Sequence, residues 1–436
     1  MSRFTAADFE PLPPQPAAAA ESFSEAPPLW RVLFADIRAC LALLVVVSVL
    51  LGAFMGPLLW PQSPATQWLS QISSGPTPAR SVELVDDETV WRGPARPPHT
   101  LVVLQATTTQ VRLGWPVLPA AHRYRVYRSD GGVGLGIPLA EVNHHWYVDR
   151  LQLREQDYRY VVVPVTAAGD TLEPMQVTAV PTLTLGRFEA ELLGLPVVEN
   201  RVELPAHPLG TDALGRDMLA RVLHGARTSM LVGLSAPLLF ITLGAFYGAA
   251  AGLLGGWVDN VLMRFADFVV ALPFLLFMIL FRVAMGIESG ESGLFPMVLA
   301  MVLLSWPSAA RLVRGQVLQL RGSAFVLSAR MAGAGNFYLI RRHLLPNVVP
   351  LLLVSLSFAI PQAIFTEALL SFIGMGVVPP TPSWGSMCNE GIRSMLTHPH
   401  ELLVPALAIS MTVLAFNMLG DALRDAMDVQ VRRGER

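Results

Sequence analysis

Six long apolar segments constrain the fold of this chain more than any other feature of its sequence. A helix needs about 20 apolar residues to cross the hydrocarbon core of a bilayer, where it satisfies its own backbone hydrogen bonds. The chain is 53% hydrophobic and only 15% charged, whereas a soluble domain is about one quarter charged. We therefore predict an all-α polytopic membrane protein with about six transmembrane helices. The expected spans are the core of 30–60, then residues 230–254, 268–283, 295–312, 348–373 and 402–419.

The basic residues exclude several classes of enzyme. The sequence contains no Lys, so all 31 basic residues are Arg. A P-loop and a Schiff-base enzyme both require Lys, so any ATP hydrolysis must come from another chain. The net charge of -2 predicts no general attraction to nucleic acid. We expect no catalytic residue, no metal and no cofactor. We also expect two unpaired thiols, Cys40 in the first apolar segment and Cys388 in a loop.

The distribution of Arg predicts the orientation of the spans. Arg31 and Arg38 precede the first apolar core, and Arg282 and Arg393 lie in the loops after the third and fifth spans. A larger cluster follows the fourth span, namely Arg311, Arg314, Arg321, Arg330, Arg341 and Arg342, and the C-terminal stretch adds Arg424, Arg432, Arg433 and Arg436. Because loops rich in Arg stay in the cytoplasm, we expect both termini and residues 312–347 to be cytoplasmic. Residues 61–200 are then extracytoplasmic.

The composition divides the chain into four parts. Residues 1–29 are rich in Pro and Ala without periodicity, which predicts a disordered cytoplasmic tail. No basic region precedes an apolar run there, so we do not expect a cleaved signal peptide. The first transmembrane helix lies within 30–60, and residues 61–200 form an insertion without a long apolar run. Residues 201–436 hold the second to sixth spans.

The insertion alternates apolar and polar residues over short stretches. Val111, Leu113 and Trp115 fall on one face of an expected strand, and Tyr124 and Val126 on one face of another. Short strands separated by turns are typical of an all-β sandwich. The strings V-x-L-x-W, Y-x-V-Y-R, W-Y-V-D and Y-x-Y-x-V follow one another here, and their order resembles a fibronectin type III domain over about 96–185. The resemblance implies that Tyr158 lies near the tyrosine corner of that fold.

Residues 321–347 lie between two spans and predict a helix, a glycine turn and a second short helix. The first helix is expected over 317–331, Gly333 and Gly335 break it, and the second over 337–343 ends before Pro346. This stretch resembles the EAA loop of ABC importer permeases, through Ala329, Gly333, Ile340, His343, Pro346 and Asn347. Leu327 and Ser328 stand where that family has Glu and Ala. The resemblance implies an ATPase-coupling loop, to which we also assign Ala334 and Asn336.

A second string precedes the second span. It runs from His207 through Gly210, Thr211, Asp212, Gly215, Arg216 and Asp217. The string resembles the H-x-L-G-T-D-x-x-G-R-D signature of permeases for dipeptides, oligopeptides and nickel. A structural interpretation is also open, in which Asp and Gly turn the chain ahead of a helix and Arg216 pairs with Asp212 or Asp217. We give little weight to the two Asp as metal ligands or acid–base groups.

Two further strings resemble the same family. Residues 379–385 match its P-x-x-x-S-W-G outer loop, and residues 420–428 match its G-D-x-L-R-D-x-x-D ending. We place Glu367, Trp384 and Gly385 at the outer mouth of the pathway. The resemblance implies a non-catalytic permease subunit in a bacterial inner membrane, with residues 201–436 as the permease core. Its implied partners are a second permease subunit, two ABC ATPase subunits, an extracytoplasmic substrate-binding protein and membrane lipid.

Alternative functions remain open at this stage. An ion-coupled secondary transporter needs ionisable residues near mid-bilayer, and the candidates Asp267 and Glu367 are expected near span ends. A membrane-tethered adhesion or receptor module would leave most of the spans unexplained. Within the importer interpretation, the cargo is a peptide or a related small solute, with a nickel or metal chelate as the alternative. The sequence does not specify the cargo or the residues that line its path.

Overall fold

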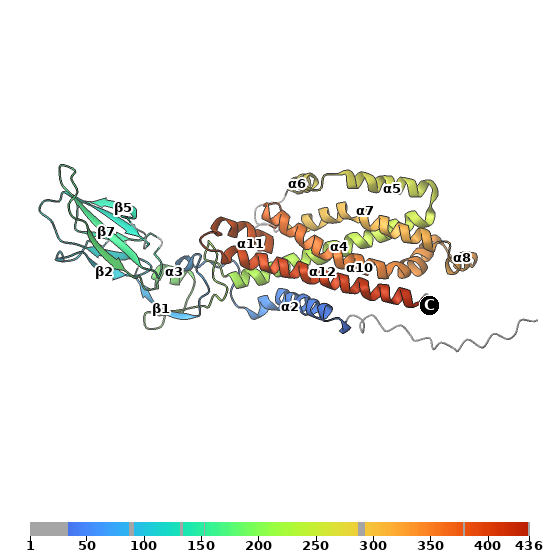
Figure 1. The fold of residues 1–436 in the computed structure, drawn as a ribbon, viewed down its shortest axis with the longest axis horizontal. Helices are drawn as coiled ribbons and strands as arrows, with labels where there is room; N and C mark the ends of the chain where they lie inside the picture. The colour runs from blue at the N-terminus through green and yellow to red at the C-terminus, as the bar shows by residue number, and fades with distance from the viewer. Residues whose placement is uncertain are drawn as a thin grey trace, which may run out of the picture.

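The computed structural model describes residues 34–86, 91–130, 134–151, 153–286, 293–377 and 380–434. Side chains are described as far as Met427. The predicted tail at 1–29 and Pro379 of the outer-loop string therefore lie outside the described residues. The molecule is elongated, with β-sheets at one end and a helical bundle at the other (Figure 1).

Five described helices are long and apolar enough to cross a membrane. They begin with α2 (Ile37–Leu59), α4 (Met218–Leu254) and α7 (Leu294–Leu320). The last two are α10 (Leu345–Phe372), whose span includes the short helical turns before it, and α12 (His400–Gly434). A sixth span is obtained if α5 (Gly256–Ala271) and α6 (Phe274–Ala284) count as one broken span. The prediction of a helical polytopic membrane protein is confirmed, with five spans or up to six.

The predicted third span is wrong in detail. We expected one span over 268–283, but α5 begins earlier, at Gly256, and ends inside that range, at Ala271. The helices α5 and α6 then meet at an angle of 86°. Leu272 takes an extended backbone conformation there, because the ring of Pro273 disfavours the helical conformation in the residue before it. The proline therefore ends one helix and starts another.

The helix α4 is central and packs against α2, α7 and α10. Its small residues allow this, as the Gly- and Ala-rich sequence predicts. A Cβ atom on Gly244 would lie 2.6 Å from the Trp306 carbonyl oxygen of α7, and one on Gly248 would lie 2.1 Å from that of Ala310. Larger residues at these two positions would therefore force α4 and α7 apart.

Seven strands form two antiparallel sheets that enclose one core. One sheet has the order β2-β3-β6 (Val102–Ala106, Val111–Gly114, Trp146–Asp149). The other has the order β5-β4-β7-β8 (Ile137–Val142, Arg123–Ser129, Tyr158–Val165, Met175–Ala179). Val111, Leu113, Trp115, Tyr124 and Val126 are buried between the sheets, as the alternation predicts.

Two polar side chains inside this sandwich share the carboxylate of Asp149. The Arg128 guanidinium donates to Asp149 at 2.7 Å, and the Tyr160 hydroxyl donates to the same carboxylate at 2.7 Å. The Tyr158 hydroxyl accepts from the backbone N–H of Arg154 at 3.0 Å. This contact ties the start of β7 to the loop before it, which is the geometry of a tyrosine corner.

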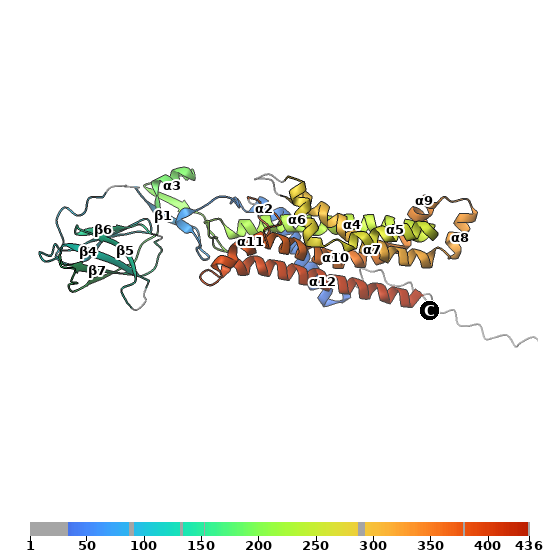
Figure 2. The same cartoon turned by 90° about the horizontal axis from the view of Figure 1, so that it is seen from above.

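A third, smaller sheet was not predicted from the sequence. It has the order β10-β1-β9, with bounds Arg201–Leu204, Arg80–Val85 and Thr184–Gly186, and α3 (Arg187–Leu192) follows β9. Both views place this sheet between the sandwich and the helical bundle (Figures 1 and 2). The chain leaves the bundle along β1 and returns along β10. The sheet therefore joins the two parts of the molecule.

Candidate functional site

The stretch after α7 forms a knob at the end of the bundle farthest from the β-sheets (Figure 1). It consists of α8 (Ala324–Met331), α9 (Asn336–Tyr338) and a π-helical turn, η3 (Leu339–Leu344). Val326, Leu339, Ile340 and Leu344 are buried in one cluster with residues of α4 and α7, including Leu253. The knob is therefore packed on the bundle as a defined structure.

Two predicted helix boundaries in the knob are wrong. The helix expected over 317–331 is interrupted, since α7 ends at Leu320 and α8 begins at Ala324. The second helix does not end before Pro346, because η3 runs directly into α10 and Pro346 lies in the first turn of α10. Proline is tolerated in a first turn. Pro346 has no backbone N–H to donate within a continuous α-helix. The π-helical turn before it has i→i+5 hydrogen bonds instead of i→i+4 bonds.

Gly333 makes the turn of the knob. Its φ is +87°, which side-chain-bearing residues rarely adopt. The N–H of Gly333 donates to the Arg330 carbonyl at 3.0 Å, and that of Ala334 donates to the Ala329 carbonyl at 3.1 Å. This pair of bonds is a Schellman motif that closes α8. A Cβ atom on Gly333 would meet no atom of this chain within 4 Å, so only the backbone conformation demands glycine here.

The knob exposes large apolar side chains. Met331 is 83% exposed and Phe337 is 69% exposed, and Phe325, Leu327 and Tyr338 are exposed beside them. Arg330, Arg341 and Arg342 are also exposed, as is Asn336. His343 is half-buried near the rings of Phe325 and Tyr338. We call the five apolar side chains the knob face; exposed apolar groups of this size indicate a partner surface.

Sequence reasoning did not find the knob face. The residues chosen from the motif, Ala329, Ala334 and Ile340, point into the packed side of the knob. The available signal was the position of Phe325, Met331 and Phe337 beside the glycine turn, in a loop otherwise rich in Arg. The roles of the chosen residues in coupling stay predictions.

Residues of the second string meet in a buried cluster at the start of α4. Asp217 is the N-cap of α4, and its carboxylate accepts from the Ala220 N–H at 2.7 Å. The same carboxylate lies 2.8 Å from Nδ1 of His207 and accepts from the Trp60 indole at 2.9 Å. It therefore ties α4 to the end of α2.

Asp212 holds the other half of this cluster. It accepts from Nε of Arg216 at 2.7 Å and also binds Arg221. Both guanidinium groups reach Glu390 of α11 (Trp384–Gly391), with Arg221 at 2.8 Å and Arg216 closer. We call Asp212, Arg216, Arg221 and Glu390 the latch. The sequence left two partners open for Arg216, and in the structure it pairs with Asp212. The sequence did not indicate that Arg221 and Glu390 also belong to this cluster.

The remaining residues of the string position the backbone. Gly210 and Gly215 have positive φ, and a Cβ atom on Gly215 would lie 2.1 Å from the Trp68 carbonyl oxygen. The Thr211 hydroxyl binds the Gln71 carbonyl, and the Thr211 carbonyl lies 3.1 Å from Nε2 of His400. Within the described part of the chain, no group of three or more His, Cys, Asp or Glu could hold a metal ion. The carboxylates here bind Arg, His and backbone N–H groups, which suits a structural junction.

Glu367, Trp384 and Gly385 are buried, and their place at the outer mouth of the pathway stays a prediction. Glu367 accepts from Ser229 and Ser371, each at 2.8 Å, and the Trp384 indole donates to the Val222 carbonyl at 3.1 Å. A Cβ atom on Gly385 would lie 2.4 Å from the Ala368 carbonyl oxygen. Trp384 and Gly385 therefore pack α11 against α4 and α10.

Cys388 is in α11 and not in a loop, which corrects the prediction for this residue. Both Cys40 and Cys388 are free thiols, as expected. Burial raises the pKa of the Cys388 thiol to about 11. The thiol is therefore protonated near neutral pH, and a protonated thiol is a poor nucleophile.

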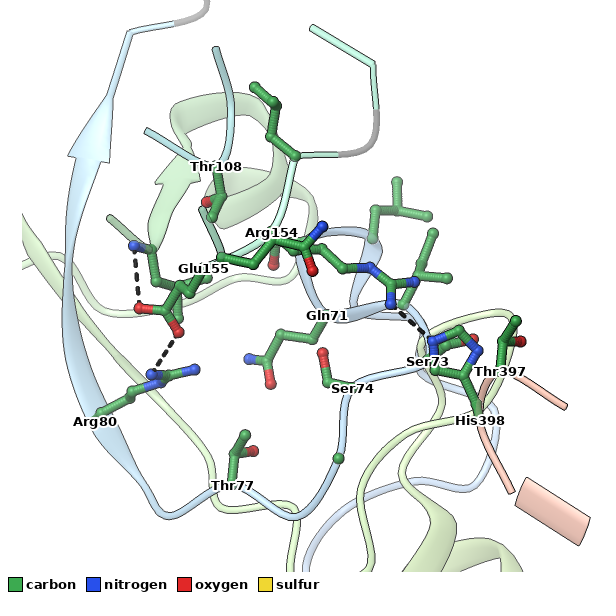
Figure 3. Close-up of a pocket in the computed structure, with 17 residues that line it drawn as sticks. Gln71, Ser73, Ser74, Thr77, Arg80, Thr108, Arg154, Glu155, Thr397 and His398 are labelled. Carbon is green, nitrogen blue, oxygen red and sulfur yellow. Dashed lines mark hydrogen bonds and ion pairs between the residues drawn. The ribbon is translucent and has the colours of Figure 1, made fainter. Parts of the chain in front are cut away.

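A cavity of about 680 Å³ lies where the sandwich meets the helical part (Figure 3). Residues 69–75 and Thr77 line it together with Arg80 of β1, the loop at 153–156 and the Thr397–His398 segment before α12. The Arg154 guanidinium donates to Nε2 of His398 at 2.7 Å, and Arg80 pairs with Glu155 at 2.8 Å. Burial, and after it the Arg154 charge, lowers the pKa of His398. This contact links the sandwich directly to the loop before α12.

Comparison with known proteins identifies the class. The family model for the binding-protein-dependent transport system inner membrane component matches residues 241–433. The dipeptide transport system permease protein DppC of Bacillus subtilis (strain 168) is 43% identical over 228 residues, which are 52% of this chain and 70% of that protein. The oligopeptide permease OppC of the same organism is 41% identical over 227 residues, covering 52% and 73%. The glutathione permease GsiD of Pectobacterium atrosepticum is 42% identical over 227 residues, covering 52% and 74%.

This chain belongs to the family of binding-protein-dependent transport system inner membrane components. It is a permease subunit of an ABC importer and a multi-pass membrane protein. The interpretation as an ion-coupled secondary transporter is therefore set aside. Its two candidate residues have structural partners instead, since Asp267 pairs with Arg311 at 2.8 Å and Glu367 binds two serines.

Proposed function

We propose that the chain forms half of a translocation pathway for a peptide or a related small solute. A second permease subunit completes the pathway, and an extracytoplasmic binding protein delivers the solute. Two partner ATPases hydrolyse the ATP. The relatives named above transport dipeptides, oligopeptides and glutathione, which favours a short peptide over a nickel or metal chelate. The single observation that carries the proposal is the knob face.

The knob face suits docking to an ATPase. Its apolar side chains project from a packed knob, and each large one contributes about 1.5–3 kcal/mol when fully buried. The knob also exposes Arg330, Arg341 and Arg342, which can pair with acidic groups on a partner. In this proposal Ala329, Ala334 and Ile340 hold the knob rigid, Gly333 makes its turn, and Asn336, His343 and Pro346 shape its second half.

The arrangement of the molecule supports the proposed orientation. The knob and the C-terminal end of α12 lie at one end, and the β-sheets lie at the other (Figures 1 and 2). With the knob in the cytoplasm, the C-terminus is cytoplasmic and residues 61–200 are extracytoplasmic. Residues 61–200 and the knob lie on opposite sides of the membrane only if an odd number of spans separates them. The helices α4 and α7 are two spans, so the bent pair α5–α6 must cross as the third. We therefore propose six crossings with both termini cytoplasmic, and 1–29, 30–60, 61–200 and 201–436 as the parts of the chain.

We propose that the sandwich is a fibronectin type III-like domain that docks the binding protein or another partner. Its sheets of three and four strands and the Tyr158–Arg154 contact support the fold. The alternative is a decoration without effect on transport. Residues 90–190 expressed alone should be soluble with a β-rich circular dichroism spectrum. Normal uptake after their deletion would favour the decoration.

Affinity purification of the chain from its native membrane tests the proposed assembly. We expect a second permease and two P-loop ATPases to co-purify in detergent that preserves complexes. A matched preparation of the variant Phe337→Asp should retain the second permease and lose the ATPases. Recovery of the chain alone, at normal yield and without any ATPase, would contradict the proposal.

A further inference from the structure

A groove of about 510 Å³ lies between α7 and α10. Phe240 of α4 and Val270 of α5 border it. Its polar lining is neutral and comes from two helices, with Ser305 and Ser308 on α7 and Ser355, Gln362 and Thr366 on α10. Its lining contains no charged side chain among the residues that the structure describes.

The polar groups follow the length of the spans. On α10 the three positions are separated by seven and four residues, so they share one face of the helix. On α7 the two serines are three residues apart and lie on one face for the same reason. The groove therefore presents a polar strip along the direction in which a solute would cross the membrane.

Three hydroxyl groups of the strip are satisfied as donors. Ser308 donates to the Ser305 carbonyl at 2.8 Å, Ser355 to the Leu351 carbonyl at 3.0 Å, and Thr366 to the Gln362 carbonyl at 2.8 Å. Their oxygen lone pairs remain free to accept. Such a serine does not by itself mark a path, because the exposed Ser410 of α12 donates to the Ala406 carbonyl in the same way beside exposed Leu407 and Met411.

Gln362 distinguishes the groove from an ordinary lipid-facing surface. It is exposed within the span, and its side-chain amide makes no hydrogen bond to any residue that the structure describes. A side-chain amide has two donors and an acceptor oxygen, and lipid chains can satisfy none of them. The side chain therefore requires water, solute or another protein in front of it.

We propose that this groove is the chain's share of the solute path and that it binds neutral amide groups, such as the peptide groups of a short peptide. The inference rests on the proposed function and specifies where the solute touches this chain. Gln362 can donate to a peptide carbonyl and accept from a peptide N–H, and the hydroxyl oxygens add acceptors. A charged solute group would find no counter-ion in the groove, so its lining favours the neutral backbone of the cargo.

Thiol labelling of the assembled importer in membrane vesicles tests the position of the groove. Ser308→Cys and Gln362→Cys should react with a small membrane-impermeant maleimide during ATP-driven turnover. Ser410→Cys is the matched control, since Ser410 has the same residue type, exposure and hydrogen bond on the apolar face of α12. All variants keep Cys40 and Cys388, so the native thiols cancel in the comparison. Labelling of Gln362→Cys no faster than Ser410→Cys, or its cross-linking to the second permease in every state, would overturn the proposal.

Uptake of radiolabelled trialanine tests the chemistry of the groove. Gln362→Leu should lower uptake about tenfold, the effect of one lost hydrogen bond in the path, while Gln362→Asn keeps part of it. The amount of chain in the membrane and the co-purifying ATPases should be unchanged in both. Full uptake by Gln362→Leu would overturn the proposal. Absence of ATPases from the unsubstituted complex would instead contradict the proposed function.

Discussion

At the scale of single residues, Gly333 is the most specific requirement of the knob. Gly333→Val places a β-branched residue at φ +87°, which costs about 1–3 kcal/mol of local strain. Because a Cβ atom there meets no atom of this chain within 4 Å, we expect normal membrane yield. The altered turn should weaken ATPase co-purification and abolish uptake.

The control for this substitution is Gly335→Ala. Gly335 also has open space around its Cβ position, but its φ of −72° suits any residue. We expect it to leave uptake unchanged. Full uptake by Gly333→Val would show that the turn has no role in coupling, and low yield would show that the turn is needed for folding instead.

Trp384 shows how burial changes the expected effect of a substitution. Its side chain is buried and its indole donates to the Val222 carbonyl of α4. Truncation of a buried Trp costs about 3–5 kcal/mol, so Trp384→Ala should lower both membrane abundance and thermal stability. Trp257→Ala, at a residue 74% exposed, is the control and should change neither. Unchanged abundance with lost uptake for Trp384→Ala would favour a direct role in gating.

At the scale of elements, the latch fixes α4 relative to α11. Arg221 is buried and contacts both Asp212 and Glu390. Breaking a buried ion pair by removing one partner costs about 3–5 kcal/mol, because the other charge stays buried. Arg221→Ala should therefore lower the thermal unfolding temperature of the detergent-solubilised importer.

The control for the latch is an ion pair on the surface. Arg264 lies 3.5 Å from Asp267, and its side chain is 86% exposed. An exposed pair contributes about 0–1 kcal/mol, so Arg264→Ala should leave the unfolding temperature nearly unchanged. Equal effects of Arg221→Ala and Arg264→Ala would show that the latch does not stabilise the α4–α11 contact.

Elements with a strong local signal could be predicted from the sequence. Long apolar runs predict the spans, since the requirement to satisfy the backbone in lipid leaves only helices. Alternating residues predict strands, and Trp115 and Val126 lie on the buried faces as expected. The small sheet could not be predicted, because Arg80 pairs with Leu204 across more than a hundred residues. The π-helical turn at Leu339–Leu344 also depends on surroundings that no local pattern contains.

The sequence motifs located the candidate sites along the chain, but they did not predict the contacts that their residues make. The string at 207–217 indicated a turn ahead of a helix, and its partners Trp60 and Glu390 came only from the structure. The motif in the knob selected residues that pack inward, since side chains such as Ile340 support the knob. Partner-facing residues such as Phe337 have no local rule that identifies them. The neutral groove was missed because its lining is spread over α7 and α10.

At the scale of the whole molecule, the contact between Arg154 and His398 predicts pH-dependent docking of the sandwich. Nε2 of His398 can accept from Arg154 only while the imidazole is neutral. Arg154, Glu401 and His400 are the charged and titratable groups that influence it, and burial is the main cause that lowers its pKa below 6.5. Docking is therefore fully stabilised above pH 6.5 and weakens as the pH falls through the lower pKa of the docked state.

Hydrogen–deuterium exchange of the importer measures this effect. After correction for intrinsic rates, the Thr397 and His398 amides, which bond to the Ser394 carbonyl, should exchange faster at about pH 5.5 than at about pH 7.5. Arg154→Gln removes the charged donor and should abolish most of the difference. If the exchange of Arg154→Gln kept the same pH dependence, a titratable group outside the Arg154–His398 contact would be its cause.

The central claim is that the knob face docks the ATPase and couples its ATP hydrolysis to transport through a permease whose helices pack against α4. Binding-protein-stimulated ATP hydrolysis by the purified complex in liposomes tests it most directly. The unsubstituted complex should show stimulated hydrolysis, and Phe337→Asp should lose it because an unpaired charge is buried at the interface. Phe188→Asp introduces the same charge at a residue that is also 69% exposed, on α3 among the β-sheets, and should retain hydrolysis. Full stimulated hydrolysis by the Phe337→Asp complex would contradict the claim.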